Sequence, residues 1–194
     1  MSIRARIGAV ALAVTAALTV TLFTAGTASA ATCDPRLQPA GDIGARWVQL
    51  GAGNGVLGCP TGAEKGLPDG ATGSQQFFQN GHVVVSPNQG SHLVTVAYRQ
   101  GNRAFFTWGY TNPFSYDLFQ VRWATTTQPD VWYRPNRQIE FKDADGGHRQ
   151  SGSWFLDRTS ATPTMFSFQV QGCDRSWGNT TCRQGWTYPV HVRV

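Results

Sequence analysis

The sequence predicts a mainly β protein, with a small β-hairpin module that carries one short helix, followed by an antiparallel β-sandwich. Two observations predict this fold class. The 194 residues include 22 Gly, 10 Pro, 7 Trp and 11 Phe but only 14% charged residues, so turn formers and large apolar side chains are abundant. From residue 104 onward, short runs alternate apolar and polar residues between turn signals, which is typical of a sandwich.

Residues 1–30 are expected to form a secretory signal peptide. Arg4 and Arg6 supply a positive start, an apolar run follows, and Ala28-Ser29-Ala30 is a small-residue cleavage site. The apolar run is short for a membrane-spanning helix, which needs ~20 residues. We therefore expect a secreted protein, extracellular or cell-wall associated, without a membrane span.

The four cysteines are Cys33, Cys59, Cys173 and Cys182. Export places them in an oxidising environment, so two disulfides are expected. Three pairings are possible, and the grouping at opposite ends favours Cys33–Cys59 and Cys173–Cys182. The first would tie the leader at residues 31–41 to a turn, and the second would staple a short loop. Zinc binding is the alternative, but the spacings lack the usual pairs of close ligands.

The first predicted module covers residues 42–98. Asp42 is predicted to cap a short helix whose buried face carries Ile43, Trp47 and Leu50, spaced i, i+4 and i+7. Leu57–Pro60 is predicted to be a rigid turn, because its glycine and proline specify backbone angles that other residues resist.

A hairpin is predicted next. Asn80-Gly81 stands between the strand-like runs Gln75–Gln79 and His82–Ser86, and Asn-Gly is the strongest short hairpin signal. Residues 93–98 form a further strand. The polar segment at residues 99–103 is interpreted as the boundary to a second module at residues 103–194.

Six strand-like runs are predicted in the second module. They are Ala104–Tyr110, Asp117–Thr125, Arg137–Lys142, Gly152–Arg158, Met165–Gln171 and Tyr188–Val194.

Residues 42–98 resemble one LGFP repeat, a module found in exported actinobacterial proteins. The matching features follow the order of the family: Leu50-Gly51, Gly55–Thr61, Glu64, Pro68-Asp69-Gly70, Asn80-Gly81, Ser86-Pro87, Gly90, His92 and Val94. The resemblance implies a cell-wall association module. Cys59 replaces the phenylalanine of the family motif, and only one copy is present. Because repeats usually pack on neighbouring repeats, this copy must lean on the second module or on its disulfide.

Residues 103–194 resemble, more loosely, a fibronectin type III domain. The resemblance rests on Phe119–Trp123, on Pro163–Gln171, where Phe166 replaces the usual tyrosine, and on Gly185–Val190. These are packing motifs that name no ligand.

No enzyme motif is present: the sequence lacks Gly-X-Ser-X-Gly, His-Glu-X-X-His and a phosphate loop. Cys59 with His92 as nucleophile and base, and Glu64 with Asp69 as a hydrolase carboxylate pair, are the catalytic alternatives. A disulfide and a pair of turns explain these residues more simply. We therefore expect a non-enzymatic protein that uses no cofactor and no metal.

The candidate ligand contacts lie mostly around the second predicted disulfide. They are Trp177, Trp186, Arg175 and Arg183, with His92 added from the first module. Exposed tryptophans on a stapled loop provide large, rigid contact area for carbohydrate or protein. Packing of these tryptophans on the disulfide is the competing interpretation.

The expected function is therefore a monomeric, secreted binding module associated with the cell wall or envelope, whose partner is a wall glycan or envelope polymer. The alternative is a protein-binding or inhibitor module that acts on another extracellular protein through stapled loops. A cell-wall hydrolase is the third reading. A net charge of +5 without a basic stripe does not favour nucleic acid as a partner.

Overall fold

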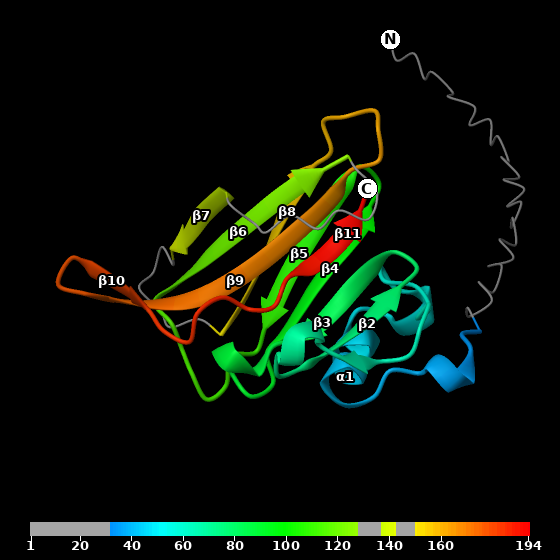
Figure 1. The fold of residues 1–194 in the computed structure, drawn as a ribbon, viewed down its shortest axis with the longest axis horizontal. Coiled ribbons are helices and arrows are strands. Elements are labelled where there is room, and N and C mark those ends of the chain that lie inside the picture. The colour runs from blue at the N-terminus through cyan, green and yellow to red at the C-terminus, as the bar shows by residue number, and fades with distance from the viewer. Residues whose placement is uncertain (1–31, 128–136, 143–149) are drawn as a thin grey trace, which may run out of the picture.

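The structure, a computed structural model, describes residues 32–127, 137–142 and 150–194 (Figure 1). The predicted signal peptide at residues 1–30 lies outside these residues. In the described ranges, no helix is long and apolar enough to cross a membrane. The architecture is mainly β, with antiparallel sheets in a sandwich-like arrangement, which confirms the predicted fold class.

A short helical region precedes the sheets. It contains η1 (Pro35–Leu37), α1 (Gly41–Gln49) and η2 (Ala52–Asn54). The predicted apolar face of α1 is present, since Ile43 and Trp47 are buried. The predicted cap is wrong, because Ala40 occupies the N-cap and Asp42 lies within the first turn. The Asp42 carboxylate instead contacts Nδ1 of His92, with both oxygens at 3.1 Å.

The first sheet has six strands in the order β1-β2-β3-β4-β5-β8. They are β1 (Lys65–Gly66), β2 (Ser74–Phe78), β3 (Gly81–Val85), β4 (Val94–Gln100), β5 (Arg103–Gly109) and β8 (Ser151–Asp157). Two short helical turns, η3 (Pro68–Gly70) and η4 (Pro87–Gln89), connect the early strands.

The predicted hairpin is present, but its two-residue loop begins one residue earlier than the predicted Asn80-Gly81 turn. Phe78 pairs with Gly81, so Gln79 and Asn80 form the loop and Gly81 belongs to β3. Position 81 requires glycine because the neighbouring strand leaves no room for a side chain. A Cβ there would lie 2.2 Å from the carbonyl oxygen of Ala97. The glycine that resembled a turn residue therefore permits close packing of β3 on β4.

The second sheet has the order β10-β9-β6-β7, with β11 also pairing β9. Its strands are β6 (Leu118–Thr126), β7 (Arg137–Lys142), β9 (Met165–Ser176), β10 (Asn179–Cys182) and β11 (Val190–Arg193). β9 is longer than predicted and turns into β10, so the predicted stapled loop is a β-hairpin. Cys173 and Cys182 are direct partners in its ladder.

Both predicted disulfide pairings are present. Cys33–Cys59 joins the leader to the turn before β1, and Cys173–Cys182 joins β9 to β10. Each cysteine predicted to form a disulfide therefore has its expected partner.

The predicted module boundary falls inside the first sheet. Residues 99–103 form the β4–β5 hairpin, in which Gln100 pairs with Arg103, and the sheet continues across it. The main hydrophobic core joins the two halves of the chain: Val84 and Leu93 share one cluster with Phe168 and Val192. A second cluster lies between α1 and the outer face of the first sheet.

Candidate functional site

The Leu57–Pro60 turn is fixed from three sides. Gly58 has φ +70°, and a Cβ there would lie 2.5 Å from Oε1 of Gln79. The same Gln79 oxygen accepts a hydrogen bond of 3.0 Å from the backbone N–H of Cys59. From the helix, Nε1 of Trp47 donates to the carbonyl oxygen of Gly58 at 2.9 Å. These contacts and the disulfide make the turn a structural joint between α1 and the β2–β3 hairpin.

The η4 turn attaches this half of the chain to the segment that leads into β11. Asn88 Nδ2 donates to the carbonyl oxygens of Gln184 (2.9 Å) and Trp186 (3.1 Å). Ser86 Oγ accepts from the backbone N–H of Tyr188 at 2.9 Å. Three polar groups of the segment at residues 184–188 are thereby satisfied by two side chains, which positions that segment over the first sheet.

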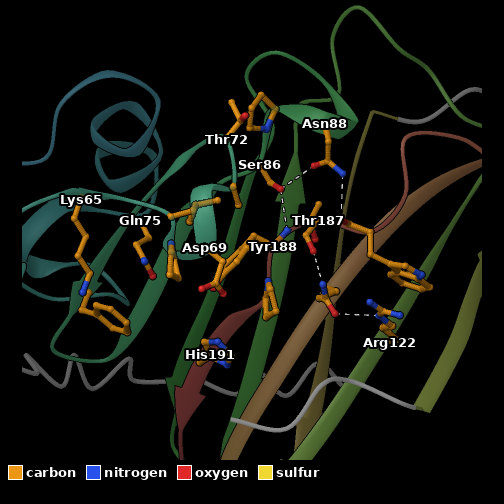
Figure 2. Close-up of a pocket in the computed structure, with 18 residues that line it drawn as sticks. Lys65, Asp69, Thr72, Gln75, Ser86, Asn88, Arg122, Thr187, Tyr188 and His191 are labelled. Atoms are coloured by element: carbon orange, nitrogen blue, oxygen red, sulfur yellow. Dashed lines mark hydrogen bonds between the residues drawn. The ribbon is translucent and has the colours of Figure 1, made fainter.

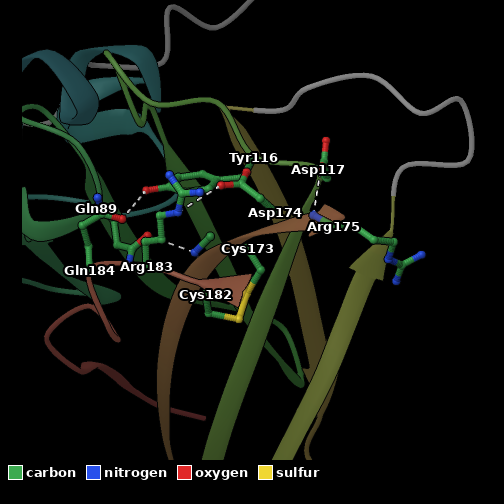
Figure 3. A network of polar contacts seen from close by, with 10 residues as sticks. Gln89, Tyr116, Asp117, Cys173, Asp174, Arg175, Cys182, Arg183 and Gln184 are labelled. Atoms are coloured by element: carbon green, nitrogen blue, oxygen red, sulfur yellow. Dashed lines mark hydrogen bonds and ion pairs between the residues drawn. A yellow bond between two sulfur atoms is a disulfide. The ribbon is translucent and has the colours of Figure 1, made fainter. Parts of the chain in front are cut away.

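Gln89 completes the attachment. Its side chain is buried, Nε2 donates to the carbonyl oxygens of Arg183 and Gly185, and Oε1 accepts from the backbone N–H of Gly172 at 2.9 Å. Figure 3 shows Gln89 beside Arg183 and Gln184, close to the second disulfide. One amide therefore joins η4 both to β9 and to the segment before β11.

A groove of about 1110 Å³ lies between η3, η4 and β1–β2 on one side and the segment before β11 on the other (Figure 2). Its lining combines aromatic rings, amides, hydroxyls and a few charges. The principal side chains are Lys65, Asp69, Gln75, Phe77, Arg122, Gln169, Trp186, Thr187, Tyr188 and His191.

One end of the groove is built from a column of stacked groups. Nζ of Lys65 lies 5.5 Å from the centroid of the Phe77 ring. Phe77 stacks on His82 with centroids 4.1 Å apart, and His82 stacks on His191 at 5.7 Å. Phe77 and His82 are direct partners across β2 and β3, so strand register brings the rings together.

The hydrogen bonds of His82 define its tautomer. Nδ1 accepts from the backbone N–H of His191 at 3.2 Å, so the ring proton is on Nε2, which donates to Oε1 of Gln75 at 3.1 Å. Burial, and then the positive charge of Lys65, lower the pKa of His82 to about 3. Burial, and then His82, lower the pKa of His191 to about 2. Both imidazoles are therefore neutral at physiological pH.

The other end of the groove is built around Trp186. The Cζ atom of Arg122 lies 4.2 Å from the centroid of the Trp186 ring, and Arg122 Nε donates to Oε1 of Gln169 at 3.0 Å. Gln169 in turn donates from Nε2 to the carbonyl oxygen of Thr187. The ring is half-buried and its orientation is set by this chain of contacts.

The five predicted contact residues lie in three separate places. Trp177, Arg175 and Arg183 are on the β9–β10 hairpin and its exit, Trp186 lines the groove, and His92 contacts Asp42 at the start of α1. Trp177 is fully exposed at the hairpin tip. Toward the disulfide end of the hairpin, Arg183 Nε lies 3.7 Å from Oδ2 of Asp174, and the backbone N–H of Arg175 donates to Asp117 (Figure 3).

The residues of the predicted catalytic alternatives lie in different surroundings. Cys59 is in a disulfide, and His92 contacts Asp42. Glu64 is exposed, whereas Asp69 lines the groove from η3 with φ +58°. Among the described residues, no group of three or more His, Cys, Asp and Glu side chains could hold a metal ion.

Sequence reasoning missed most of the groove, including Arg122, Gln169, Tyr188 and the pair His82 and His191. The residue pattern of β9 does contain a signal for buried polar groups. Gln169 and Gln171 alternate with apolar residues of β9 yet are buried, and a buried amide needs partners. The pattern does not contain the partners, because Gln169 reaches Arg122 and Thr187 only after β6, β9 and the segment before β11 have assembled.

Comparison with known proteins gives one match. Residues 57–101 match the family model of the LGFP repeat. No family match confirms the fibronectin type III resemblance of residues 103–194, and neither a curated protein nor a solved structure matches the chain. LGFP repeats occur in exported proteins, and the two disulfides are likewise consistent with an extracellular location.

The matched span begins at the Leu57–Pro60 turn and ends in the β4–β5 hairpin, so it omits α1, which was included in the expected module. It contributes β1 to β4 of the first sheet and one wall of the groove. Residues 57–101 are therefore similar to an LGFP repeat, and they form part of the first sheet of a larger, mainly β protein.

Proposed function

We propose that this protein is a secreted, non-enzymatic binding protein of the cell envelope, and that its groove binds a carbohydrate-containing polymer. The LGFP repeat supports envelope association. The repeat forms only one wall of the groove, and the segment before β11 forms the opposite wall. Binding is therefore a property of the combined structure, which explains how a chain with a single copy of the repeat builds a site.

The observation that carries the proposal is the chemistry of the groove. Sugars present apolar ring faces and many hydroxyl groups, so a sugar site combines aromatic faces with oriented amides and hydroxyls. Trp186, Tyr188 and Phe77 provide rings, and Gln75, Gln169 and Thr187 provide polar groups. Several of these polar groups are held by hydrogen bonds, so little side-chain entropy is lost on binding.

A sedimentation assay on purified cell wall tests the proposal. The mature chain, beginning at Ala31, is mixed with wall in the presence and absence of soluble wall glycan. We expect retention that the glycan competes away, and we expect Trp186→Ala to reduce it at least ~10-fold, as for a central aromatic contact. Thermal unfolding shows whether the variant is folded. Absence of retention for the wild-type chain would contradict the proposal.

Trp177→Ala is the matched control, because this tryptophan is on the β9–β10 hairpin and does not line the groove. It should be retained like the wild type. The full exposure of Trp177 also supports a second candidate function, docking of another extracellular protein on the hairpin tip. Retention that glycan does not compete and that Trp177→Ala abolishes would favour this second function.

A hydrolase is separated from a binder by turnover. We expect labelled wall incubated with the mature chain to release no soluble fragments. Release that is lost in the double variant Glu64→Gln with Asp69→Asn would show catalysis by those carboxylates and would contradict the proposal.

A further inference from the structure

We propose that the outer face of the first sheet, beside α1, holds an oxyanion site centred on Arg46. The ligand that fits it is an acid, in which a carboxylate or phosphate group is attached to an apolar, ring-bearing portion. Arg46 does not line the groove, so the inference goes beyond the proposed function.

Strand register places the site on the face that α1 partly covers. Thr107 is the direct partner of Val96, which packs in one cluster with the buried face of α1. Arg46 reaches this position from α1, and its Nη2 donates to Oγ1 of Thr107 at 2.9 Å. The helix lies against β3 and β4, whereas β5 and β8 extend beyond it (Figure 1). Arg46 therefore lies at the border between the helix and the exposed part of the sheet.

The guanidinium of Arg46 is half-buried and is held by neutral groups. Besides the bond to Thr107, Nη1 donates to Oε1 of Gln49 at 3.2 Å, and Nε is buried with no hydrogen-bond partner. Among the described residues, no carboxylate pairs with it. Asp42, one turn earlier on α1, contacts His92 instead. Two of the five N–H donors of Arg46 are therefore used, and both acceptors are uncharged.

A buried charge without a counter-ion is unfavourable, so buried cations are ordinarily paired. Burial lowers the pKa of Arg46, although the nearby phenol groups of Tyr110 and Tyr98 act to raise it. Arginine nevertheless stays protonated, so its charge persists. Arg103, on the same face, shows the usual arrangement, because its Nε donates to Oδ1 of Asp157 at 2.7 Å. A carboxylate or phosphate of a ligand would give Arg46 the same kind of partner.

The rest of the ligand would meet a row of aromatic side chains. Tyr98, Phe105 and Phe155 are partners across β4, β5 and β8. Tyr98 stacks on Phe105 with centroids 5.2 Å apart, and Phe155 lies 5.5 Å from Phe105 and is 41% exposed. Phe105 precedes Thr107 by two residues, so the row and Arg46 share one face of the sheet. An acid attached to a ring could contact both.

An NMR titration of the mature chain tests the inference. Benzoate and phenyl phosphate separate the two kinds of acid. Acetate and inorganic phosphate lack the ring, and benzyl alcohol lacks the charge. At constant ionic strength, we expect at least one aryl acid to give saturable shifts of the Arg46, Thr107 and Tyr110 amides. It should bind at least ~3-fold more tightly than the same acid without the ring, and at least ~10-fold more tightly than benzyl alcohol.

Variants locate the anion. Arg46→Gln should weaken binding of the aryl acid at least ~10-fold, and Arg46→Lys, which keeps the charge but loses the planar fork, should bind with intermediate affinity. The matched control is Arg36→Gln, which removes an exposed arginine that pairs with Asp34, and it should bind like the wild type. The amide spectrum of each variant shows whether it is folded.

Four results would overturn the inference. They are no saturable shift with either aryl acid, acetate and inorganic phosphate that bind as tightly as the aryl acids, benzyl alcohol that binds as tightly, and a folded Arg46→Gln protein that binds like the wild type. If Arg46→Gln does not fold, Arg46→Lys decides, since wild-type affinity in that variant contradicts a site built on the guanidinium. No wall material is used, so these results do not depend on binding in the groove.

Discussion

The backbone N–H of His191 donates to Nδ1 of His82, and the two imidazole rings stack with their planes 7° apart. His82 lies in the segment that matches the LGFP repeat model and His191 lies in β11, so this contact joins two segments that are 109 positions apart in the chain. The acceptor must be unprotonated for the bond to exist. The junction between the repeat and the rest of the protein therefore depends on a neutral histidine.

Acid should destabilise the protein through this pair. The pKa of an unfolded histidine is ~6.5, whereas burial lowers the pKa of folded His82 to about 3. Between those values the unfolded chain binds more protons, so stability is fully present above pH ~6.5 and is lost as pH falls. We expect a loss of about 1 kcal/mol per buried histidine for each pH unit in this window, measured by urea unfolding.

A variant distinguishes the contribution of the buried histidines to the pH dependence of stability from that of the carboxylates, which also take up protons on acidification. His191→Gln should reduce the slope of unfolding free energy against pH below ~6.5. An unchanged slope in His191→Gln would show that the buried pair is not responsible.

Gly81→Ala should destabilise the protein by about 3 kcal/mol or more. The added Cβ would lie 2.2 Å from the carbonyl oxygen of Ala97 and 2.8 Å from Cδ2 of Leu57, so β3 must move away from β4. Gly66→Ala is the matched control in β1, because a Cβ there has nothing within 4 Å. Thermal and urea unfolding of both variants measure the difference, and equal stabilities would contradict the clash.

Gln89→Met should cost about 2–4 kcal/mol. The side chain keeps its approximate size, but the N–H of Gly172 and the carbonyls of Arg183 and Gly185 lose their partner inside the fold. Gln100→Met, at an exposed position of β4, should be close to neutral. Because Gln89 positions the segment before β11, we also expect weaker wall retention at temperatures where the variant is folded.

Removing the two disulfides should have unequal effects. The loop-closure relation gives about 3.5 kcal/mol for Cys33–Cys59, with a sequence separation of 26, and about 2.6 kcal/mol for Cys173–Cys182, with a separation of 9. Double cysteine-to-serine variants of each pair, compared by urea unfolding, measure the order. A larger loss at Cys173–Cys182 would contradict the loop-length argument.

The local parts of the fold could be predicted from the sequence. The buried face of α1, the β2–β3 hairpin and the alternating runs of β6 and β9 depend on neighbours a few residues apart, and the pattern of apolar residues reports them. Predictions failed where a distant contact decided the outcome. Asp42 does not cap α1 because the helix begins at Gly41, and its carboxylate contacts His92, 50 positions away. A side chain at position 81 would meet the carbonyl oxygen of Ala97 on the neighbouring strand.

The candidate site depended on such distant contacts throughout. The sequence predicts Trp186 as a ligand contact because a tryptophan near a disulfide can offer a large, rigid contact area. Its place opposite η3 could not be predicted, because it requires Gln89 and Asn88 to hold residues 183–186. The stacking of His82 on His191 has the same character, since 109 positions separate the two in the chain.

The β4–β5 hairpin, in which the sheet of the repeat continues into the rest of the protein, limits how the chain could be divided. β4 is the last strand of the repeat and also an interior strand of the six-stranded sheet. A fragment beginning at Arg103 would lack β4, so β5 would become an edge strand in which about every second residue presents unpaired backbone groups along a new, apolar edge. Such an edge recruits strands from other molecules, so the repeat also protects its own chain from self-association.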